Sequence, residues 1–262
     1  MNRLLEIAAD VREALEERKS ARPLESFAPG LRPGAPGRLR RALTRSSLDE
    51  PVRFIAEIKM ASPSRGPLNV NVDPVEQARL YLEGGASALS VLTEQKHFLG
   101  SPEYLARVTR SVDLPALQKD FVLEDYQLYE AAELGASAVL LIAALLPRHR
   151  LAALREAASL LGLDSLVEVH DEAELDEALA SGAEILGVNN RDLRTFEISI
   201  ETTFRLLPRI PEGPVVVSES GVMERSHVQR LEEAGVDALL VGEALMRSGD
   251  PVARLRELRG VA

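Results

Sequence analysis

The sequence contains no cysteine and no tryptophan, and its 262 residues include only four histidines. Without cysteine there can be no disulfide, no thiol nucleophile and no cysteine-ligated metal site. The histidines have no metal-ligand spacing, so we expect no metal site. His149 and His227 are expected at the surface, and His170 is interpreted as structural.

Long apolar runs are also missing. The longest, from Ala138 to Leu146, is far below the roughly 20 residues that a membrane-spanning helix needs. The first 20 residues have no apolar core and no cleavage site typical of a secretory signal. We therefore expect a cytoplasmic protein that does not bind membranes.

The balance of charge is acidic. Lys and Arg total 31 against 41 Asp and Glu, a net charge of −10. This argues against binding nucleic acid through bulk electrostatics, but it leaves room for a local basic pocket that holds a small anion.

A glycine-centred phrase recurs four times along the chain. Each copy follows a stretch of helix-forming residues and precedes a short, continuously apolar run. The copies begin at Glu83, Glu133, Ala180 and Glu233. Glycine favours the left-handed cap that ends a helix, and a strand apolar on consecutive positions is covered on both faces. The pattern predicts parallel strands flanked by helices.

Eight such strands are predicted. They lie near Arg53–Ile58, Ala88–Leu92, Ala116–Gln118, Ala138–Ile142, Ser165–Val169, Ile185–Val188, Val215–Val217 and Ala238–Val241. The helices between them are expected at Pro74–Glu83, Pro102–Arg110, Leu123–Leu134, Arg148–Leu161, Glu172–Ala180, Ile200–Leu207, Arg225–Ala234 and Pro251–Leu258. Eight alternating units fit an α/β fold of the (β/α)8 TIM-barrel type. An open doubly wound sheet is the alternative, but no glycine-rich nucleotide turn follows the first strand.

We expect one barrel domain over residues 1–262, of which 1–48 form an N-terminal helical extension. The extension should contain a helix at about Arg3–Lys19, an irregular Pro- and Gly-rich connection, and a short helix near Leu39–Arg45. The extension could be a loose linker or a lid over one end of the barrel. We favour a helix packed on the outer barrel surface.

Polar groups gather where the predicted strands end, which is where barrel enzymes place functional residues. Two residues apart on one strand, Glu57 and Lys59 should share a face, and so should Glu168 and His170. A buried unpaired charge costs several kcal/mol, so a structural ring of ion pairs is one interpretation and an acid–base site is the other.

Lysines and glutamates at one barrel mouth suit a reaction that moves several protons. Lys59 and Lys119 could act there as general acids. In general, burial and the proximity of a second lysine lower the pKa of a lysine, and nearby carboxylates oppose that effect. Arg191 and the turns Ser220-Gly221 and Gly242-Glu243 suit a phosphate, because barrels commonly bind phosphate after strands seven and eight.

Taken together, these strand ends resemble the indole-3-glycerol-phosphate synthase family. The strings that carry the resemblance are Ile55–Lys59 with Ala61–Gly66, Ser90–Glu94, Gln118–Phe121, Leu166–His170, Gly187–Leu193, Ser218–Gly221 and Leu240–Met246. They occur in order over nearly the whole chain. The family is a (β/α)8 barrel with an N-terminal helical extension, in agreement with the pattern above.

The resemblance implies a lyase of tryptophan biosynthesis that needs no cofactor. It would convert 1-(2-carboxyphenylamino)-1-deoxyribulose 5-phosphate to indole-3-glycerol phosphate, with loss of carbon dioxide and water. Lys119 would be the general acid of ring closure, and Glu168 and Lys59 would serve the later proton transfers and dehydration. Glu57 would orient Lys59 or act as a base.

The same resemblance implies how an anionic phosphorylated substrate would be held. Asn189 and Glu219 would bind its hydroxyls and anilino group, and Ser220 belongs to both the catalytic and the phosphate set. Phe121 and Leu193 would pack on the aromatic ring. The remaining phosphate ligands would be Ser62, Arg191, Gly221, Gly242 and Glu243.

Two positions depart from the family pattern. Met60 replaces a commonly basic residue and should point toward the helices, and the side chain of Glu243 should turn away from the phosphate. The alternatives are another phosphate-binding barrel enzyme, such as a sugar-phosphate isomerase, and a non-catalytic phosphate-binding barrel. We expect a monomer or a weak dimer.

Overall fold

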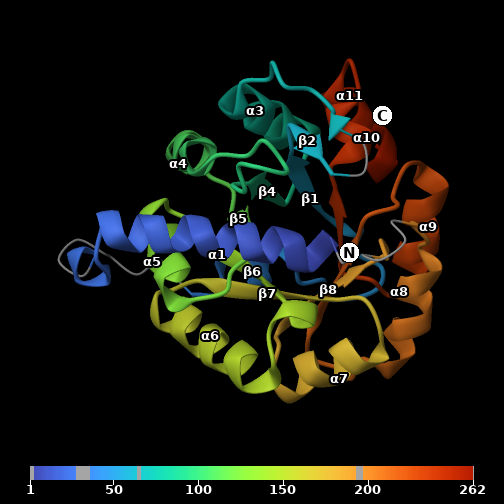
Figure 1. Cartoon of the computed structure of the whole chain (residues 1–262). Helices are drawn as coiled ribbons and strands as arrows, with labels where there is room; N and C mark the ends of the chain where they lie inside the picture. Colours follow the sequence, from blue (N-terminus) through green and yellow to red (C-terminus); the bar gives the residue numbers. More distant parts are fainter. Residues whose placement is uncertain (1–2, 28–35, 64–65, 193–196, 262) are drawn as a thin grey trace.

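A computed structural model describes residues 3–27, 36–63, 66–192 and 197–261. Eight parallel strands close into a barrel in the spatial order β1-β10-β9-β8-β7-β6-β5-β4 (Figure 1). Their bounds are β1 Arg53–Ile58, β4 Ala88–Leu92, β5 Ala116–Lys119, β6 Ala138–Ile142, β7 Asp164–Val169, β8 Ile185–Asn189, β9 Val215–Glu219 and β10 Ala238–Val241. The predicted (β/α)8 barrel and all eight predicted strands are confirmed.

The outer helices follow the predicted order. They are α3 Pro74–Gly84, α4 Pro102–Ser111, α5 Asp125–Glu133, α6 Arg148–Leu160, α7 Glu172–Ala180, α8 Glu201–Leu206, α9 Arg225–Glu233 and α11 Pro251–Arg259. The side chains of Asp73, Ser101 and Asp250 accept hydrogen bonds from the first-turn amides of α3, α4 and α11. The four repeated glycines have φ between 79° and 96°, the left-handed conformation that ends a helix.

Several short elements were not predicted. A hairpin of β2 (Ala61–Ser62) and β3 (Gly66–Pro67) follows β1, and the short helix α10 (Glu243–Met246) follows β10. Three 3-10 turns lie at η1 Leu24–Ser26, η2 Ala143–Leu145 and η3 Leu207–Arg209. Such short segments have too few residues to show a periodic pattern.

The strands separate two apolar layers because successive side chains point to opposite faces. On β6, Val139 and Leu141 pack in the layer between strands and helices, whereas Leu140 and Ile142 pack inside the barrel. Met60 packs in the layer between strands and helices, as predicted. The side chains that point into the barrel therefore occupy every second position along a strand.

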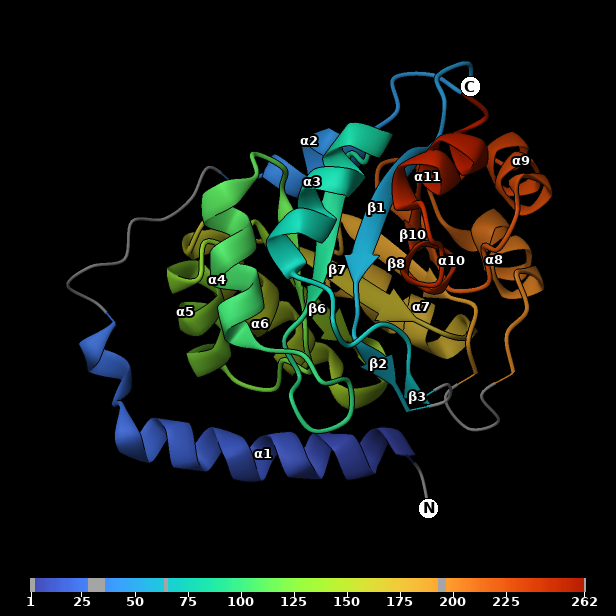
Figure 2. The ribbon, with the colours of Figure 1, turned by 90° about the horizontal axis from the view of Figure 1, so that it is seen from above.

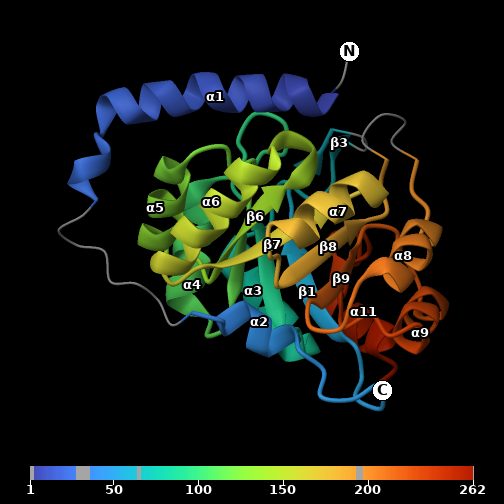
Figure 3. The ribbon, with the colours of Figure 1, turned by 90° about the horizontal axis from the view of Figure 1, so that it is seen from below.

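Two helices cap the ends of the barrel interior. The interior cluster includes Leu4, Ile7 and Val11 from α1 (Arg3–Ala21) and Leu39 and Leu43 from α2 (Arg38–Leu43). Figures 2 and 3 show α1 lying across one end of the barrel and α2 at the other. The interior is thus sealed by chain that precedes the first strand.

The expectation that the first helix packs on the outer surface is wrong. Helix α1 lies across the carboxyl ends of the strands, where its apolar face meets Phe121 and Ile142 from the barrel mouth. Arg18 anchors its far end to Glu130 of α5, with 2.9 Å between Nε and Oε1. Apolar side chains at the mouth give this face a partner that the outer helix ring does not offer.

None of the helices in the described ranges is long and apolar enough to cross a membrane.

Candidate active site

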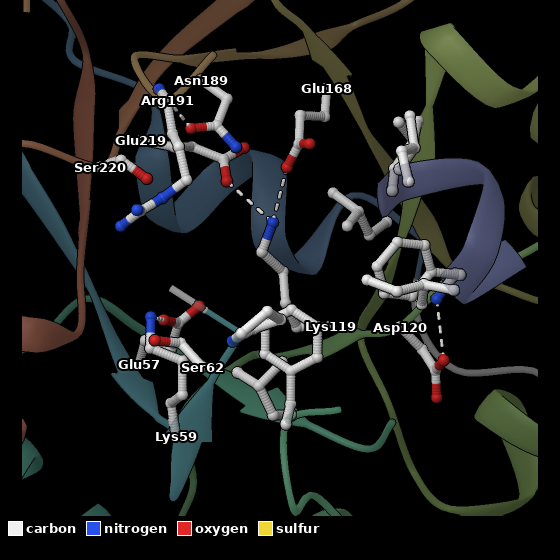
Figure 4. Close-up of a pocket in the computed structure, with 18 of the residues that line it drawn as sticks. Glu57, Lys59, Ser62, Lys119, Asp120, Glu168, Asn189, Arg191, Glu219 and Ser220 are labelled. Atoms are coloured by element: carbon white, nitrogen blue, oxygen red, sulfur yellow. Dashed lines mark hydrogen bonds and ion pairs between the residues drawn. The ribbon is translucent and has the colours of Figure 1, made fainter. Parts of the chain in front are cut away.

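Five polar side chains continue the inward positions at the carboxyl ends of their strands. Glu57, Lys119, Glu168, Asn189 and Glu219 all lie at or near a strand end and all line one pocket. Figure 4 shows them converging from different strands on one space. The predicted convergence of these strand ends is confirmed.

Lys119 lies at the centre of this group. Its Nζ donates to Glu168 Oε2 at 2.7 Å and to Glu219 Oε2 at 2.9 Å (Figure 4). The carboxylate residues are only 3% and 1% exposed, so the contacts are shielded from bulk water. A buried ammonium between two buried carboxylates is well placed to deliver or receive a proton.

The environment separates the proton affinities of these groups. Burial opposes the charge of Lys119, but the facing carboxylates, Glu168 foremost, outweigh it and raise the pKa of the lysine above its ordinary value. Burial alone would raise the pKa of Glu168, but Lys119 and His170 bring it well below the usual range. Burial raises the pKa of Glu219 to about 7, although Lys119 acts in the opposite direction. Two carboxylates that share one lysine thus differ in proton affinity.

A second ion pair lies on β1 and just beyond it. Lys59 Nζ pairs with Glu57 Oε1, and Ser90 Oγ lies 3.4 Å from the other Glu57 oxygen. Glu57 fits because Gly242 opposite has no side chain, since a Cβ there would lie 2.5 Å from Glu57 Oε1. This glycine therefore makes room for an acidic side chain.

The pocket is lined by both polar and apolar side chains. Its volume is about 140 Å³, and its apolar residues come from α1, from strand ends and from the residues that follow them. We call these residues the apolar wall: Leu4, Ile7, Leu92, Phe98, Phe121, Leu140, Ile142 and Leu240. Only Phe121 and Leu193 were predicted for an aromatic ring, and Leu193 lies outside the described residues. The rings of Phe98 and Phe121 pack with centroids 6.1 Å apart.

Sequence reasoning missed most of this wall. Phe98 follows β4 in a loop, and Arg3, Leu4 and Ile7 belong to the helix assigned to the outer surface. The apolar period of α1 was visible, but the sequence does not say which surface that face meets. Asp120 also lines the pocket, but Figure 4 shows its carboxylate pointing away from Lys119. That carboxylate accepts a hydrogen bond from the hydroxyl of Thr93.

An adjoining pocket of about 270 Å³ contains the predicted phosphate residues. Arg191, Ser220, Gly221, Gly242 and Glu243 line it, together with Glu57 and Lys59 from the neighbouring pocket. Ser62 lines the neighbouring pocket instead. The structure thus joins the two predicted groups of residues into one continuous site.

The turn after β9 has an unusual backbone. Ser220 and Gly221 have φ of 65° and 87°, so two consecutive residues are left-handed. A non-glycine residue in this region is uncommon and is often found at ligand sites. Successive amides in such a turn can converge on an anion.

The side chain of Glu243 ion-pairs with Arg247 one helical turn later, at 3.4 Å. Glu243 also lines the adjoining pocket, so the expectation that its side chain turns away from a phosphate stays a prediction. His149 is exposed as predicted, and His227 is half-buried. His170, interpreted as structural, lies with Nε2 3.4 Å from Glu168 Oε1.

Comparison with solved structures shows the fold. The chain resembles 3-hexulose-6-phosphate synthase from Salmonella typhimurium with a TM-score of 0.66 and 13% identity, over 80% of this chain and 97% of that one. A tryptophan synthase complex from Pyrococcus furiosus gives a TM-score of 0.59 and 17% identity, over 81% and 99%. At these identities the likeness concerns architecture alone.

Comparison of sequences identifies the family. A family model described as indole-3-glycerol phosphate synthase matches residues 4–258. The indole-3-glycerol phosphate synthase of Chloroherpeton thalassium is 46% identical over 248 residues, 95% of each chain. That of Dehalococcoides mccartyi is 51% identical over 210 residues, 79% of this chain and 81% of the other. The chain belongs to the indole-3-glycerol phosphate synthase family.

Proposed function

We propose that this protein converts 1-(2-carboxyphenylamino)-1-deoxyribulose 5-phosphate to indole-3-glycerol phosphate, carbon dioxide and water. The observation that carries the proposal is the ammonium of Lys119, held by two buried carboxylates between an apolar wall and an anion pocket. This reaction needs a positioned acid, a place for an aromatic ring and a place for a phosphate, all within the length of one substrate molecule.

Ring closure comes first. The aromatic carbon that bears the carboxylate attacks the ketone carbon, and Lys119 donates a proton to the ketone oxygen as negative charge develops there. The flanking carboxylates keep Lys119 protonated before the substrate enters. A preorganised cation in a water-poor site stabilises such a developing oxyanion far better than water does.

Decarboxylation follows on the apolar side of the pocket. The carbon–carbon bond to the carboxylate breaks, and its electron pair restores the aromatic ring as neutral carbon dioxide leaves. Phe98, Phe121 and Leu140 surround this position with few hydrogen-bond donors. An apolar wall favours the neutral product over the charged carboxylate.

Dehydration completes the indole. The hydroxyl made during ring closure takes a proton and leaves as water, and the adjacent methylene gives up a proton to form the new double bond. Lys59 and Glu168 provide the acid and the base, with Glu57 holding the Lys59 ammonium in place. Asn189 and Glu219 bind the substrate's hydroxyls and anilino nitrogen, which orients the ring.

The phosphate is held at the adjoining pocket by Arg191, Ser62 and the two turns at Ser220-Gly221 and Gly242-Glu243. Phosphate binding there fixes one end of the substrate and the apolar wall fixes the other. Anchoring at both ends brings the reacting carbons to Lys119, and correct positioning of this kind contributes several kcal/mol to catalysis.

The test is to mix the purified protein with the anilino-deoxyribulose phosphate and follow indole fluorescence, with product mass as confirmation. We expect turnover without added metal or organic cofactor. Folded protein that binds the substrate but forms no indole product would refute the proposal. A separate assay, in which the two sugar phosphates of a ketose–aldose pair are quantified after incubation with the protein, tests the alternative of an isomerase.

A further inference from the structure

His170, just after β7, is enclosed between two carboxylates. Its Nδ1 lies 2.9 Å from Glu174 Oε2, and its Nε2 lies 3.4 Å from Glu168 Oε1. The side chain is 11% exposed, and the His170 amide also donates to Glu174 Oε2 at 2.8 Å. The ring is therefore fixed by its own backbone and by the start of α7.

Nδ1 is within hydrogen-bond distance of Glu174 Oε2, and Nε2 lies at ion-pair distance from Glu168 Oε1 without a hydrogen bond. Carboxylate oxygens only accept hydrogen bonds. In a neutral imidazole, one of the two nitrogens carries no hydrogen. The lone pair of that nitrogen would face a carboxylate oxygen and be repelled by it. The arrangement favours an imidazolium with hydrogen on both nitrogens. Burial opposes the charge, but Glu168 and Glu174 outweigh it and raise the pKa of His170 to about 10.

Glu168 consequently has a cation at each oxygen. Oε2 accepts from Lys119 at 2.7 Å, and Oε1 faces His170 at 3.4 Å. With only Lys119 present, the carboxylate could rotate about its last torsion and exchange its oxygens. The second cation removes that freedom and disfavours protonation of Glu168.

We propose that His170 is a positioning residue of the site, an imidazolium that holds Glu168 ionised and turned toward Lys119. The proposal deepens the proposed function and rests on it where turnover is concerned. It does not make His170 a catalytic residue, because the ring reaches the pocket of Lys119 only through Glu168.

Other charged groups around His170 come from three segments. Asp171 caps α7 and accepts from the Glu174 amide, and Arg205 of α8 places its guanidinium 3.4 Å from the His170 carbonyl. Asp192 and Glu197 line the pocket of about 410 Å³ that His170 also lines. Among the described residues, charges of both signs thus surround His170, and Glu168 and Glu174 are the carboxylates in contact with its ring.

The first experiment measures the charge state directly in the wild-type protein. Nitrogen-15 NMR of histidine-labelled protein has only four residues to resolve, and His170→Gln assigns the signal. We expect both His170 nitrogens to carry hydrogen at pH 8, where an ordinary histidine with a pKa of about 6.5 is neutral. A neutral His170 at pH 8 would overturn the proposal, whatever reaction the enzyme catalyses.

The second experiment tests the consequence for catalysis. His170→Gln keeps a donor of similar size but loses the charge, and His170→Lys restores a charge. We expect kcat to fall about tenfold in the glutamine variant with KM within about twofold, because a misdirected catalytic group mainly costs turnover. We expect the lysine variant to recover most of the loss.

The pH profile separates positioning from packing. Losing the cation raises the proton affinity of the Glu168–Glu219 pair, so the acid limb of kcat should move up by about one pH unit in His170→Gln. The matched control is His149→Gln on α6, an exposed histidine that should leave the profile unchanged. Equal losses in the glutamine and lysine variants with an unmoved limb would show a packing role and refute the proposal.

A further variant covers the case in which changes at His170 prevent folding. Glu174→Gln leaves the ring in place and removes one of its two carboxylates. We expect the His170 titration to shift to lower pH by about one unit or more. An unchanged titration would contradict the argument. Absence of turnover in the wild type would refute the proposed function alone, since the NMR result stands by itself.

Discussion

Gly187 in the middle of β8 makes room for Glu219, and replacing it with alanine should disable the site. A Cβ there would lie 2.1 Å from Glu219 Oε1 and 2.5 Å from Leu166 Cδ2. The first distance is about 1.3 Å short of the 3.4 Å at which ordinary contact begins. Both neighbours are buried, so neither can move into solvent.

The carboxylate has to move, and its movement breaks the 2.9 Å contact with Lys119. A displacement of about 1 Å at a reacting group can cost roughly 100-fold in rate, and overpacking a core costs about 1–3 kcal/mol of stability. We therefore expect Gly187→Ala to lose about 100-fold in kcat while the barrel still folds with a lowered Tm.

The assay is steady-state indole formation together with thermal unfolding followed by circular dichroism. The matched control is Gly249→Ala, because Gly249 is exposed and a Cβ there meets no atom within 4 Å. We expect this control to keep wild-type turnover and Tm. If Gly187→Ala turns over within threefold of wild type, the argument that Glu219 needs this space is wrong.

Three further predictions concern separate parts of the site. Lys119→Ala should lose about 1,000-fold in turnover, as expected for a general acid, while calorimetry still detects substrate binding; near-normal turnover would mean the acid is another residue. Ile7→Ala on α1 should raise KM several-fold with Tm lowered by a few degrees, measured by kinetics and calorimetry, because Ile7 is 4% exposed and lines the apolar wall. The pKa of His170 is raised to about 10 in the folded state from about 6.5 in the unfolded state. The contribution of its charge to the stability of the fold is therefore complete below pH 6.5 and is lost as the pH rises toward 10. Urea unfolding across that pH range should show that the difference in free energy of unfolding between wild type and His170→Gln vanishes. A difference that stays constant with pH would contradict this prediction.

The barrel itself was predictable because its local signals agree with one another. Short runs such as Ala88–Leu92 are apolar on consecutive positions, and glycines such as Gly85 and Gly135 end the preceding helices. The inward direction of the polar strand ends agrees with the alternation of side chains along a strand, because Glu57 lies two residues after Ile55, which points into the barrel. These inferences need only residues close together in the sequence.

The position of α1 was not predictable in the same way. Its apolar residues Leu4, Ile7 and Val11 are typical of any packed helix, and they contact Phe121 and Ile142 more than 100 residues away. Which surface an amphipathic helix covers depends on where the chain leaves apolar atoms uncovered. That is a property of the closed barrel.

Periodicity and motif spacing are local, so they were enough to predict the eight parallel strands, the family, and the lysines and glutamates at the strand ends. The closed barrel was needed to see that Lys119 pairs with Glu168 and Glu219, that Gly187 makes room for one of these carboxylates, and that His170 faces the other. Proton affinity depends on burial and on the distance between charges, and Lys119 and Glu219 are 100 residues apart in the chain. Closure of the barrel brings their side chains to 2.9 Å.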